Sequence, residues 1–204
     1  MSNSFKNKSV LFVISGPSGV GKDSLVSEIR KSMDDFHFAI TATTRQLRTE
    51  EQDGVDYLFL SNTQFKTMIN SNQLLEWAIV YENYYGVPKD QIRQGISAGK
   101  DIIVKTDVQG AETIKKKFPQ SVLIFIAPES YTDLKSRLKK RSNKGVLSGD
   151  FDLRISEAKN EIEKSKNFDH IIINKENELI DTLNKFTEIV AIEKKIPKPD
   201  ILII

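Results

Sequence analysis

No cysteine occurs among the 204 residues of this sequence, so disulfide bonds and thiol chemistry are excluded. The two histidines, His37 and His170, have no cysteine or acidic partner in a metal-binding spacing, and we interpret both as structural. The net charge is only +2, which gives no bulk electrostatic reason to expect a nucleic acid or a membrane as partner.

Long hydrophobic runs are missing as well. The first apolar run, Val10–Ile14, is too short for a signal peptide, and no window approaches the length of a membrane span. Hydrophobic residues make up 39% and charged residues 28% of the chain, as in soluble globular proteins. We therefore expect a soluble, cytoplasmic protein with a single α/β domain.

The most informative stretch begins where that short run ends. Its spacing is that of the P-loop, G-x-x-x-x-G-K-[ST], in which free N–H groups, a helix start and a lysine together bind phosphates. One position departs from the pattern, because Asp23 stands where Ser or Thr normally places a hydroxyl on Mg²⁺. The candidate nucleotide-binding residues are Gly16, Pro17, Ser18, Gly19, Val20, Gly21, Lys22, Asp23 and Ser24.

Strand and helix patterns alternate along most of the chain, which predicts a parallel sheet with its ligand site at the carboxyl ends of the strands. The predicted core strands are Ser9–Ser15, Asp101–Asp107, Ser121–Ala127 and His170–Asn174. The predicted helices run from the P-loop to Met33 and over Lys89–Ala98, Gly110–Phe118, Ser130–Arg141, Phe151–Lys166 and Glu176–Lys194.

Residues 37–87 interrupt this alternation and predict a small inserted lobe with a mixed or mostly antiparallel sheet, in which the strand over Tyr57–Leu60 pairs antiparallel. Its predicted strands are Phe36–Thr43, Tyr57–Leu60, Leu74–Val80 and Asn83–Val87, and Ser61 or Asn62 caps its helix. The expected core comprises 9–36, 88–141 and 167–195, with a mobile lid over 142–166 and a tail over 196–204. The apolar end of the tail is expected to dock on the domain or on a neighbouring subunit, which leaves a homo-oligomer open.

The inserted lobe carries a second set of anion-binding side chains. Arg45 and Arg48 are three residues apart in a turn, so both guanidinium groups can converge on one phosphate. Tyr57 and Tyr85, on strands predicted to be neighbours, can add hydroxyl donors. Glu76 lies on the predicted strand that comes between these two along the chain. A carboxylate there is either exposed at an edge or accepts paired N–H donors from a ligand, as on the N1–H and N2–H₂ edge of guanine.

Four further motifs then make a specific resemblance. Ile40–Tyr57 (ITATTRQLRTEEQDGVDY), Leu75–Ala78 (LEWA), Asn83–Gly86 (NYYG) and Thr106–Ala111 (TDVQGA) follow the P-loop in an order and spacing that resemble the guanylate kinase family, over residues 9–190. The resemblance implies an α/β fold with helices on both faces of a parallel sheet, a GMP-binding lobe and a mobile lid. It also implies phosphorylation of GMP by ATP, with Mg²⁺.

The same resemblance implies roles for single residues. Guanine would be read by Thr41 and Glu76, supported by Asp107, and the GMP phosphate would be held by Arg45, Arg48, Tyr57 and Tyr85, with Glu51 bracing the arginines. Lys22 would hold the ATP phosphates, Asn174 would lie near the adenine, and Arg137, Arg141 and Arg154 would close over the transferring group. Asp23 and, through water, Asp107 are the candidate Mg²⁺ ligands.

A second departure involves Lys105, which stands where the family usually has Glu or Asp. Strand geometry predicts Lys105 and Asp107 on one face, near the strand end that faces the nucleotide. We hypothesise that the changes at Asp23 and Lys105 are coupled: either Lys105 neutralises Asp23, or Asp23 binds Mg²⁺ directly.

Two other functions stay open at this point. One is a P-loop kinase of a phosphorylated sugar such as ribose 1,5-bisphosphate, against which the base-reading set Thr41, Glu76 and Tyr85 argues. The other is a non-catalytic guanylate-kinase-like module that binds phosphopeptides, and such modules typically lose the lysine that is present here as Lys22.

Overall fold

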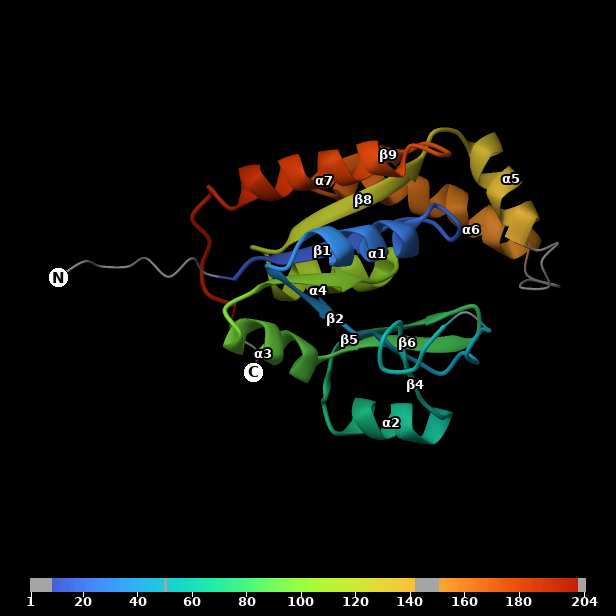
Figure 1. The fold of residues 1–204 in the computed structure, drawn as a ribbon. Helices are drawn as coiled ribbons and strands as arrows, with labels where there is room; N and C mark the ends of the chain where they lie inside the picture. Colours follow the sequence, from blue (N-terminus) through green and yellow to red (C-terminus); the bar gives the residue numbers. More distant parts are fainter. Residues whose placement is uncertain (1–8, 50, 142–150, 202–204) are drawn as a thin grey trace.

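The computed structural model describes residues 9–49, 51–141 and 151–201, except for the side chain of Arg141. At its centre is a five-stranded parallel sheet, and Figure 1 shows helices on both faces of this sheet, which confirms the predicted fold class. In sheet order the strands are β2 (Phe36–Ala39), β7 (Asp101–Lys105), β1 (Leu11–Ser15), β8 (Val122–Pro128) and β9 (His170–Asn174). The helices are α1 (Lys22–Ser32), α2 (Asn62–Asn70), α3 (Lys89–Ser97), α4 (Val108–Lys117), α5 (Tyr131–Arg141), α6 (Phe151–Glu163) and α7 (Leu179–Glu193), followed after α6 by a 3₁₀ turn over Lys164–Asn167.

Strand β1 is apolar up to its last residue, Ser15, and all five of its residues are buried, because both faces of the sheet are covered. Phe12 and Ile14 belong to a hydrophobic cluster with the buried side chains of α1 and α7. Leu11 and Val13 point to the other face and belong to a cluster with α3 and α4. This burial fixes the end of β1, and with it the loop that follows.

A second sheet forms the inserted lobe, which lies below the core in Figure 1. Its strands are, in order, β4 (Leu58–Phe59), β3 (Ala42–Thr43), β6 (Asn83–Pro88) and β5 (Leu74–Val80). The prediction of one strand over Phe36–Thr43 was wrong, because β2 pairs with β7 in the core whereas β3 pairs in the lobe. Residues 37–39 therefore belong to the core sheet. The β3–β4 pair is parallel, not antiparallel as predicted, and the other two pairs are antiparallel, so the lobe sheet is mixed, which is one of the two predicted arrangements.

The predicted strand Asp101–Asp107 ends two residues early, at Lys105. Asp107 instead caps α4, where its carboxylate accepts a hydrogen bond from the Gly110 N–H at 2.7 Å. Asp competes well for free N–H groups at a helix start, which ends the strand. The prediction that Lys105 and Asp107 share one strand face was therefore wrong.

Smaller features of the chain agree with the patterns seen in the sequence. Ser61 caps α2 in a capping box with Gln64. The tail docks on the domain at Ile201, which is buried in the cluster beside α3 and α4. Residues 142–150 of the expected lid and 202–204 of the tail lie outside the described residues. Within the described part of the chain, no helix is both long and apolar enough to cross a membrane.

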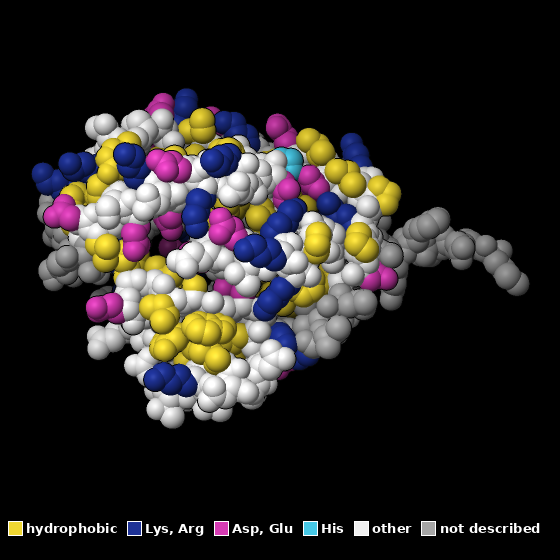
Figure 2. All heavy atoms as spheres, turned by 180° about the vertical axis from the view of Figure 1, so that it is seen from behind, with side chains coloured by type: hydrophobic (Ala, Val, Ile, Leu, Met, Phe, Trp, Pro, Cys, Tyr) yellow, Lys and Arg dark blue, Asp and Glu magenta, His cyan; other side chains and the backbone are white. Residues whose placement is uncertain are grey.

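The surface carries charges of both signs, and Figure 2 shows hydrophobic side chains gathered on the lobe in the lower part of the view. Trp77 and Ile79 on β5 are among the exposed large hydrophobic residues. Strand β5 is at the edge of the lobe sheet, so among the described residues it pairs with a strand, β6, on one side only.

We expect Gly16→Ala to lower the free energy of unfolding by about 3 kcal/mol or more, because its φ is +141° and a Cβ would overlap the Ile126 carbonyl. Gly99→Ala is the matched control, since Gly99 also has a positive φ, +64°, but open space around it. The control is expected to lose about 1 kcal/mol. Urea unfolding of both variants measures the difference, and equal losses would contradict the steric explanation.

Candidate active site

A cavity of about 590 Å³ lies where the P-loop, the lobe and α6 meet, within the size range of small-molecule sites. The predicted residues that line it are Gly16, Ser18, Gly19, Gly21, Lys22, Asp23, Ser24, Thr41, Arg45, Arg48, Tyr57, Tyr85, Asp107, Arg137, Arg154 and Asn174. Pro17, Val20, Glu51 and Glu76 are not in its lining, and the side chain of Arg141, at the end of α5, lies outside the described part of the structure. The fold thus brings together side chains from both halves of the chain.

On the donor side, the P-loop joins β1 to α1. Gly16, Gly19 and Gly21 have positive φ angles, and α1 begins at Lys22, so the free N–H groups at the helix start face the cavity. The Lys22 ammonium donates to the carbonyls of Gly16 and, at 3.1 Å, Pro17. Burial lowers the pKa of Lys22 despite the nearby carboxylate of Glu161. This loop presents N–H donors and one cation to a single point, as phosphate binding requires.

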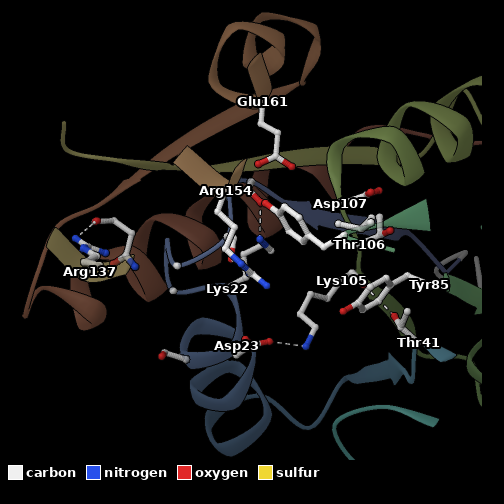
Figure 3. Close-up of a pocket in the computed structure, with 18 of the residues that line it drawn as sticks. Lys22, Asp23, Thr41, Tyr85, Lys105, Thr106, Asp107, Arg137, Arg154 and Glu161 are labelled. Carbon is white, nitrogen blue, oxygen red and sulfur yellow. Dashed lines mark hydrogen bonds and ion pairs between the residues drawn. The ribbon is translucent and has the colours of Figure 1, made fainter. Parts of the chain in front are cut away.

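Asn174 and Arg137 brace the P-loop from behind. The Asn174 amide donates to the Val20 carbonyl at 2.7 Å and accepts from the Thr182 hydroxyl at 2.9 Å. Arg137 pairs with Asp133 at 2.8 Å and donates to the Asn174 carbonyl at 2.8 Å. In Figure 3, Arg137 lies at the opposite end of the site from Tyr85 and Thr41. Both residues therefore have a structural task at the donor end.

On the lobe side, Arg45 is the centre of an anion-binding cradle formed by Arg45, Arg48, Tyr57 and Tyr85. Its guanidinium donates to both carboxylate oxygens of Glu51, at 2.8 and 3.0 Å, and to the Tyr85 hydroxyl at 3.2 Å. Burial raises the pKa of Glu51, but hydrogen bonds from Arg45 and from the Arg48 backbone outweigh it and hold that pKa below its usual value. Glu51 thus orients the arginines from behind.

The two tyrosines do not lie on neighbouring strands as predicted. Tyr57 directly precedes β4, Tyr85 is on β6, and β3 runs between them. Their rings still meet edge to face, with centroids 6.1 Å apart, and the Arg45 guanidinium is 5.5 Å from the Tyr57 centroid. The cradle therefore forms across three strands.

Glu76 is on β5, which follows β4 and precedes β6 along the chain as predicted but lies at the edge of the lobe sheet, and it is only 2% exposed. One carboxylate oxygen accepts from the Thr106 hydroxyl at 3.1 Å, and the other is buried without a hydrogen-bond partner among the described residues. Burial and then the charge of Asp107 raise the pKa of Glu76 to about 8. Nearby, the Thr41 hydroxyl donates to the Lys105 carbonyl at 3.0 Å.

Helix α6 closes the cavity from above. Arg154 donates to the Ser18 hydroxyl at 2.8 Å, and its guanidinium lies 4.2 Å from the ring centroid of Tyr81, in the turn between β5 and β6. Arg154 therefore contacts the P-loop and the lobe at the same time. Glu161, seven residues later, lies on the same helix face and points into the cavity in Figure 3. Burial raises the pKa of Glu161 to about 7.

Sequence reasoning missed Tyr81 and Glu161 as cavity residues. The seven-residue spacing from Arg154 could have indicated Glu161. Nothing local marked Tyr81, whose position depends on how the lobe hairpin meets α6.

Of the two hypothesised arrangements of Asp23, the structure shows the pairing with Lys105, whose ammonium is 2.5 Å from a carboxylate oxygen of Asp23 (Figure 3). The Lys105 ammonium also lies 4.3 Å from the centroid of the Tyr57 ring. Burial lowers the pKa of Lys105, but the charge of Asp23 outweighs it, so the pKa is raised overall. Lys105 thus stays a cation between the donor loop and the lobe.

A parallel sheet with a P-loop after β1 and an anion-binding cradle in an inserted lobe defines the class of P-loop kinases that act on small phosphorylated substrates. The family model described as guanylate kinase matches residues 8–193. The chain belongs to the guanylate kinase family.

Known proteins give the same assignment. The chain is 42% identical to a guanylate kinase of Halalkalibacterium halodurans, covering 85% of this chain and 84% of the relative. It is 39% identical to one of Desulfitobacterium hafniense, covering 93% and 92%. The crystal structure of guanylate kinase from Anaplasma phagocytophilum superimposes with a TM-score of 0.72 at 25% identity, covering 92% of this chain and 87% of that one.

The residues present fit a magnesium ion that arrives with a nucleotide. Asp23, Asp107 and Glu161 line one cavity, and one oxygen of Glu161 is buried without a hydrogen-bond partner among the described residues. No group of three or more acidic, histidine or cysteine side chains in the described ranges is placed to hold a metal ion. Magnesium in kinases is held largely by phosphates and water with one or two carboxylates, so this donor set suffices.

Proposed function

We propose that this protein transfers the γ-phosphoryl group of ATP to GMP, forming ADP and GDP. The observation that carries the proposal is that two anion sites, the P-loop with Lys22 and the cradle around Arg45, line one cavity. Phosphoryl transfer needs two polyanions held in line with their charge neutralised, and little acid–base chemistry. Two facing cationic sites serve this purpose.

In this mechanism the P-loop N–H groups and Lys22 bind the ATP phosphates, with Asn174 bracing the loop at the adenine end. Arg45, Arg48, Tyr57 and Tyr85 bind the GMP phosphate. Arg154 stabilises charge on the transferring group from α6, which acts as part of a lid that excludes water. Arg137 also stabilises charge on the transferring group, from the donor end of the site. Arg141 is assigned the same role as Arg154.

A magnesium ion, when bound, neutralises phosphate charge. Asp23 and, through water, Asp107 are the residues that would hold it together with the nucleotide, and Asp23 would then contact both the ion and Lys105. This assignment uses hard oxygen ligands, which Mg²⁺ prefers.

Guanine is recognised by Thr41 and Glu76 in this proposal, with Asp107 beside them. The unpartnered oxygen of Glu76 supports it, because a buried carboxylate oxygen without a donor is costly until a ligand supplies one. The N1–H and N2–H₂ groups of guanine are two such donors, and adenine lacks that pair. Since Glu76 lies behind Thr106 and outside the cavity lining, its exposure requires the lobe and α4 to adjust around the base.

A coupled assay of ADP formation tests the proposal with GMP, AMP and ribose 1,5-bisphosphate as acceptors. We expect turnover with GMP and at least 100-fold lower kcat/KM with the other two. Turnover with the sugar phosphate alone would identify the sugar-kinase alternative. ATP binding without turnover of any acceptor would favour a non-catalytic module.

GMP binding is expected to release most of one proton at pH 7.5, because Glu76, with a pKa of about 8, must ionise to accept the guanine donors. Titration calorimetry in buffers of different ionisation enthalpy measures this release. The release should vanish at pH 9, where Glu76 is already ionised. A binding enthalpy independent of the buffer at pH 7.5 would contradict the role of Glu76.

A further inference from the structure

We propose that Lys105 is a third cation of the acceptor site, which contacts the GMP phosphate while Asp23 on the donor loop holds its ammonium in place. The proposal rests on the proposed function, because it assigns Lys105 to the acceptor phosphate of that reaction. It deepens that function by naming a phosphate ligand outside the Arg45 cradle.

The position of Lys105 is fixed by the core sheet. It is the last residue of β7, which lies between β1 and β2, and its carbonyl accepts a hydrogen bond from the Thr41 hydroxyl at 3.0 Å. Its side chain lines the cavity and is only 14% exposed. The ammonium therefore reaches the middle of the site from a rigid strand end.

Two contacts place this ammonium between donor and acceptor. On one side it is 2.5 Å from a carboxylate oxygen of Asp23, the residue after the P-loop lysine. On the other side it is 4.3 Å from the Tyr57 ring centroid, and Tyr57 also lies 5.5 Å from the Arg45 guanidinium. Lys105 and Arg45 thus contact the same aromatic ring of the phosphate cradle.

The cradle around Arg45 has less net positive charge than its two arginines carry, which leaves a role for Lys105 in neutralising the phosphate. Arg45 and Arg48 share Glu51, at 2.8 and 3.7 Å, so one carboxylate already offsets part of their charge. A nucleotide phosphate carries up to two negative charges, and an ammonium has three donors, of which Asp23 takes one. The Asp23 side chain is 61% exposed, so water screens its charge more than that of buried Lys105.

Lys105→Met tests the contact. Because a hydrogen bond between two charged groups is lost, we expect the GMP dissociation constant, measured by calorimetry without ATP or metal, to rise about 10- to 100-fold. The dissociation constant of a non-hydrolysable ATP analogue is expected to change less than about 3-fold, and Lys105→Arg is expected to regain at least part of the GMP affinity.

Lys115→Met is the matched control, since it removes another lysine–aspartate pair, with Asp169 at 2.8 Å, outside the cavity. It should leave both dissociation constants unchanged. Unchanged GMP affinity in Lys105→Met, with only a lower melting temperature, would make the Asp23–Lys105 pair a structural tether and overturn the proposal. If wild type does not phosphorylate GMP, the proposed function fails instead, which is a separate outcome.

A double-mutant cycle on Asp23→Ser and Lys105→Glu tests the anchoring. Lys105→Glu alone places a carboxylate beside Asp23, so we expect kcat/KM for GMP to fall about 1000-fold through like-charge repulsion and loss of the cation. Adding Asp23→Ser to Lys105→Glu should raise kcat/KM for GMP at least 10-fold, although Asp23→Ser alone should lower it. Additive losses would overturn the anchoring by Asp23.

Discussion

Replacing Glu76 by glutamine is expected to make the protein more stable and nearly inactive toward GMP. The pKa of buried Glu76 is about 8, against 4.5 for an unperturbed glutamate, so the folded state binds a proton more tightly than the unfolded chain. The free energy of unfolding therefore falls as pH rises from about 4.5 to 8, and a neutral side chain removes this loss. At pH 7 the gain is about 3 kcal/mol, and below pH 4.5 it disappears.

The loss of activity has a separate cause. Glutamine offers the guanine edge one acceptor and places an N–H₂ group where a second acceptor is needed, so kcat/KM for GMP is expected to fall about 1000-fold. Urea unfolding at pH 4.5 and pH 7, with steady-state kinetics, measures both effects. Glu82→Gln is the matched control, because Glu82 is exposed in the turn after β5 and should change neither quantity. A less stable Glu76→Gln at pH 7 would contradict the buried-carboxylate explanation.

Replacing Lys22 by methionine is expected to lower kcat about 1000-fold while leaving GMP affinity unchanged. Its ammonium contacts only P-loop carbonyls among the hydrogen bonds found in the described structure, so its removal should disturb little of the fold. The loss falls on the transition state, where charge on the phosphoryl group must be neutralised.

The matched control for this variant is Lys100→Met, which removes another lysine that donates to a backbone carbonyl, that of Asp34 at 2.9 Å. Lys100 lies outside the cavity lining, and we expect wild-type kinetics from this control. Single-turnover measurements separate binding from chemistry. A Lys22→Met enzyme with kcat within 10-fold of wild type would show that the P-loop lysine is not the main donor-side cation.

The two site variants are expected to differ in stability, because Glu76→Gln should be more stable than wild type whereas Lys22→Met should change the free energy of unfolding little. Glu76 costs stability because it is buried with one oxygen unpartnered, and the proposed function needs that oxygen. Lys22 lowers the stability less, because its ammonium donates hydrogen bonds to backbone carbonyls while no phosphate is bound. Buried polar groups at a functional site can thus differ widely in what they do to the fold.

Much of the site could be predicted from local patterns. The P-loop spacing predicts a glycine-rich loop that leads directly into a helix, and in the structure the loop glycines have positive φ angles and the helix begins at Lys22. The alternating βα patterns predict the parallel sheet, because the apolar face that each strand and each helix buries can be recognised within that segment. These are properties of short segments, so a single sequence reveals them.

The sequence predicted less well which strands are neighbours and where each strand ends. The change of sheet between β2 and β3, the parallel β3–β4 pair and the edge position of β5 depend on which distant strands pair. Alternation with period two is the same in either sheet and in either direction, so it carries no information about partners. The early end of β7 depends on Asp107 capping α4, a local competition that hydrophobic pattern does not show.

The sequence by itself determined the kind of chemistry: a P-loop, a pair of arginines three residues apart and two unusual residues, Asp23 and Lys105. Only the tertiary structure decided that Asp23 and Lys105 meet, that Lys105 also reaches Tyr57, and that Glu161 and Tyr81 line the same cavity. The physical reason is the separation along the chain of the residues that interact. Loop conformation and helix starts are set by neighbours along the chain, whereas a contact across 82 residues exists only because the core sheet brings β7 beside β1.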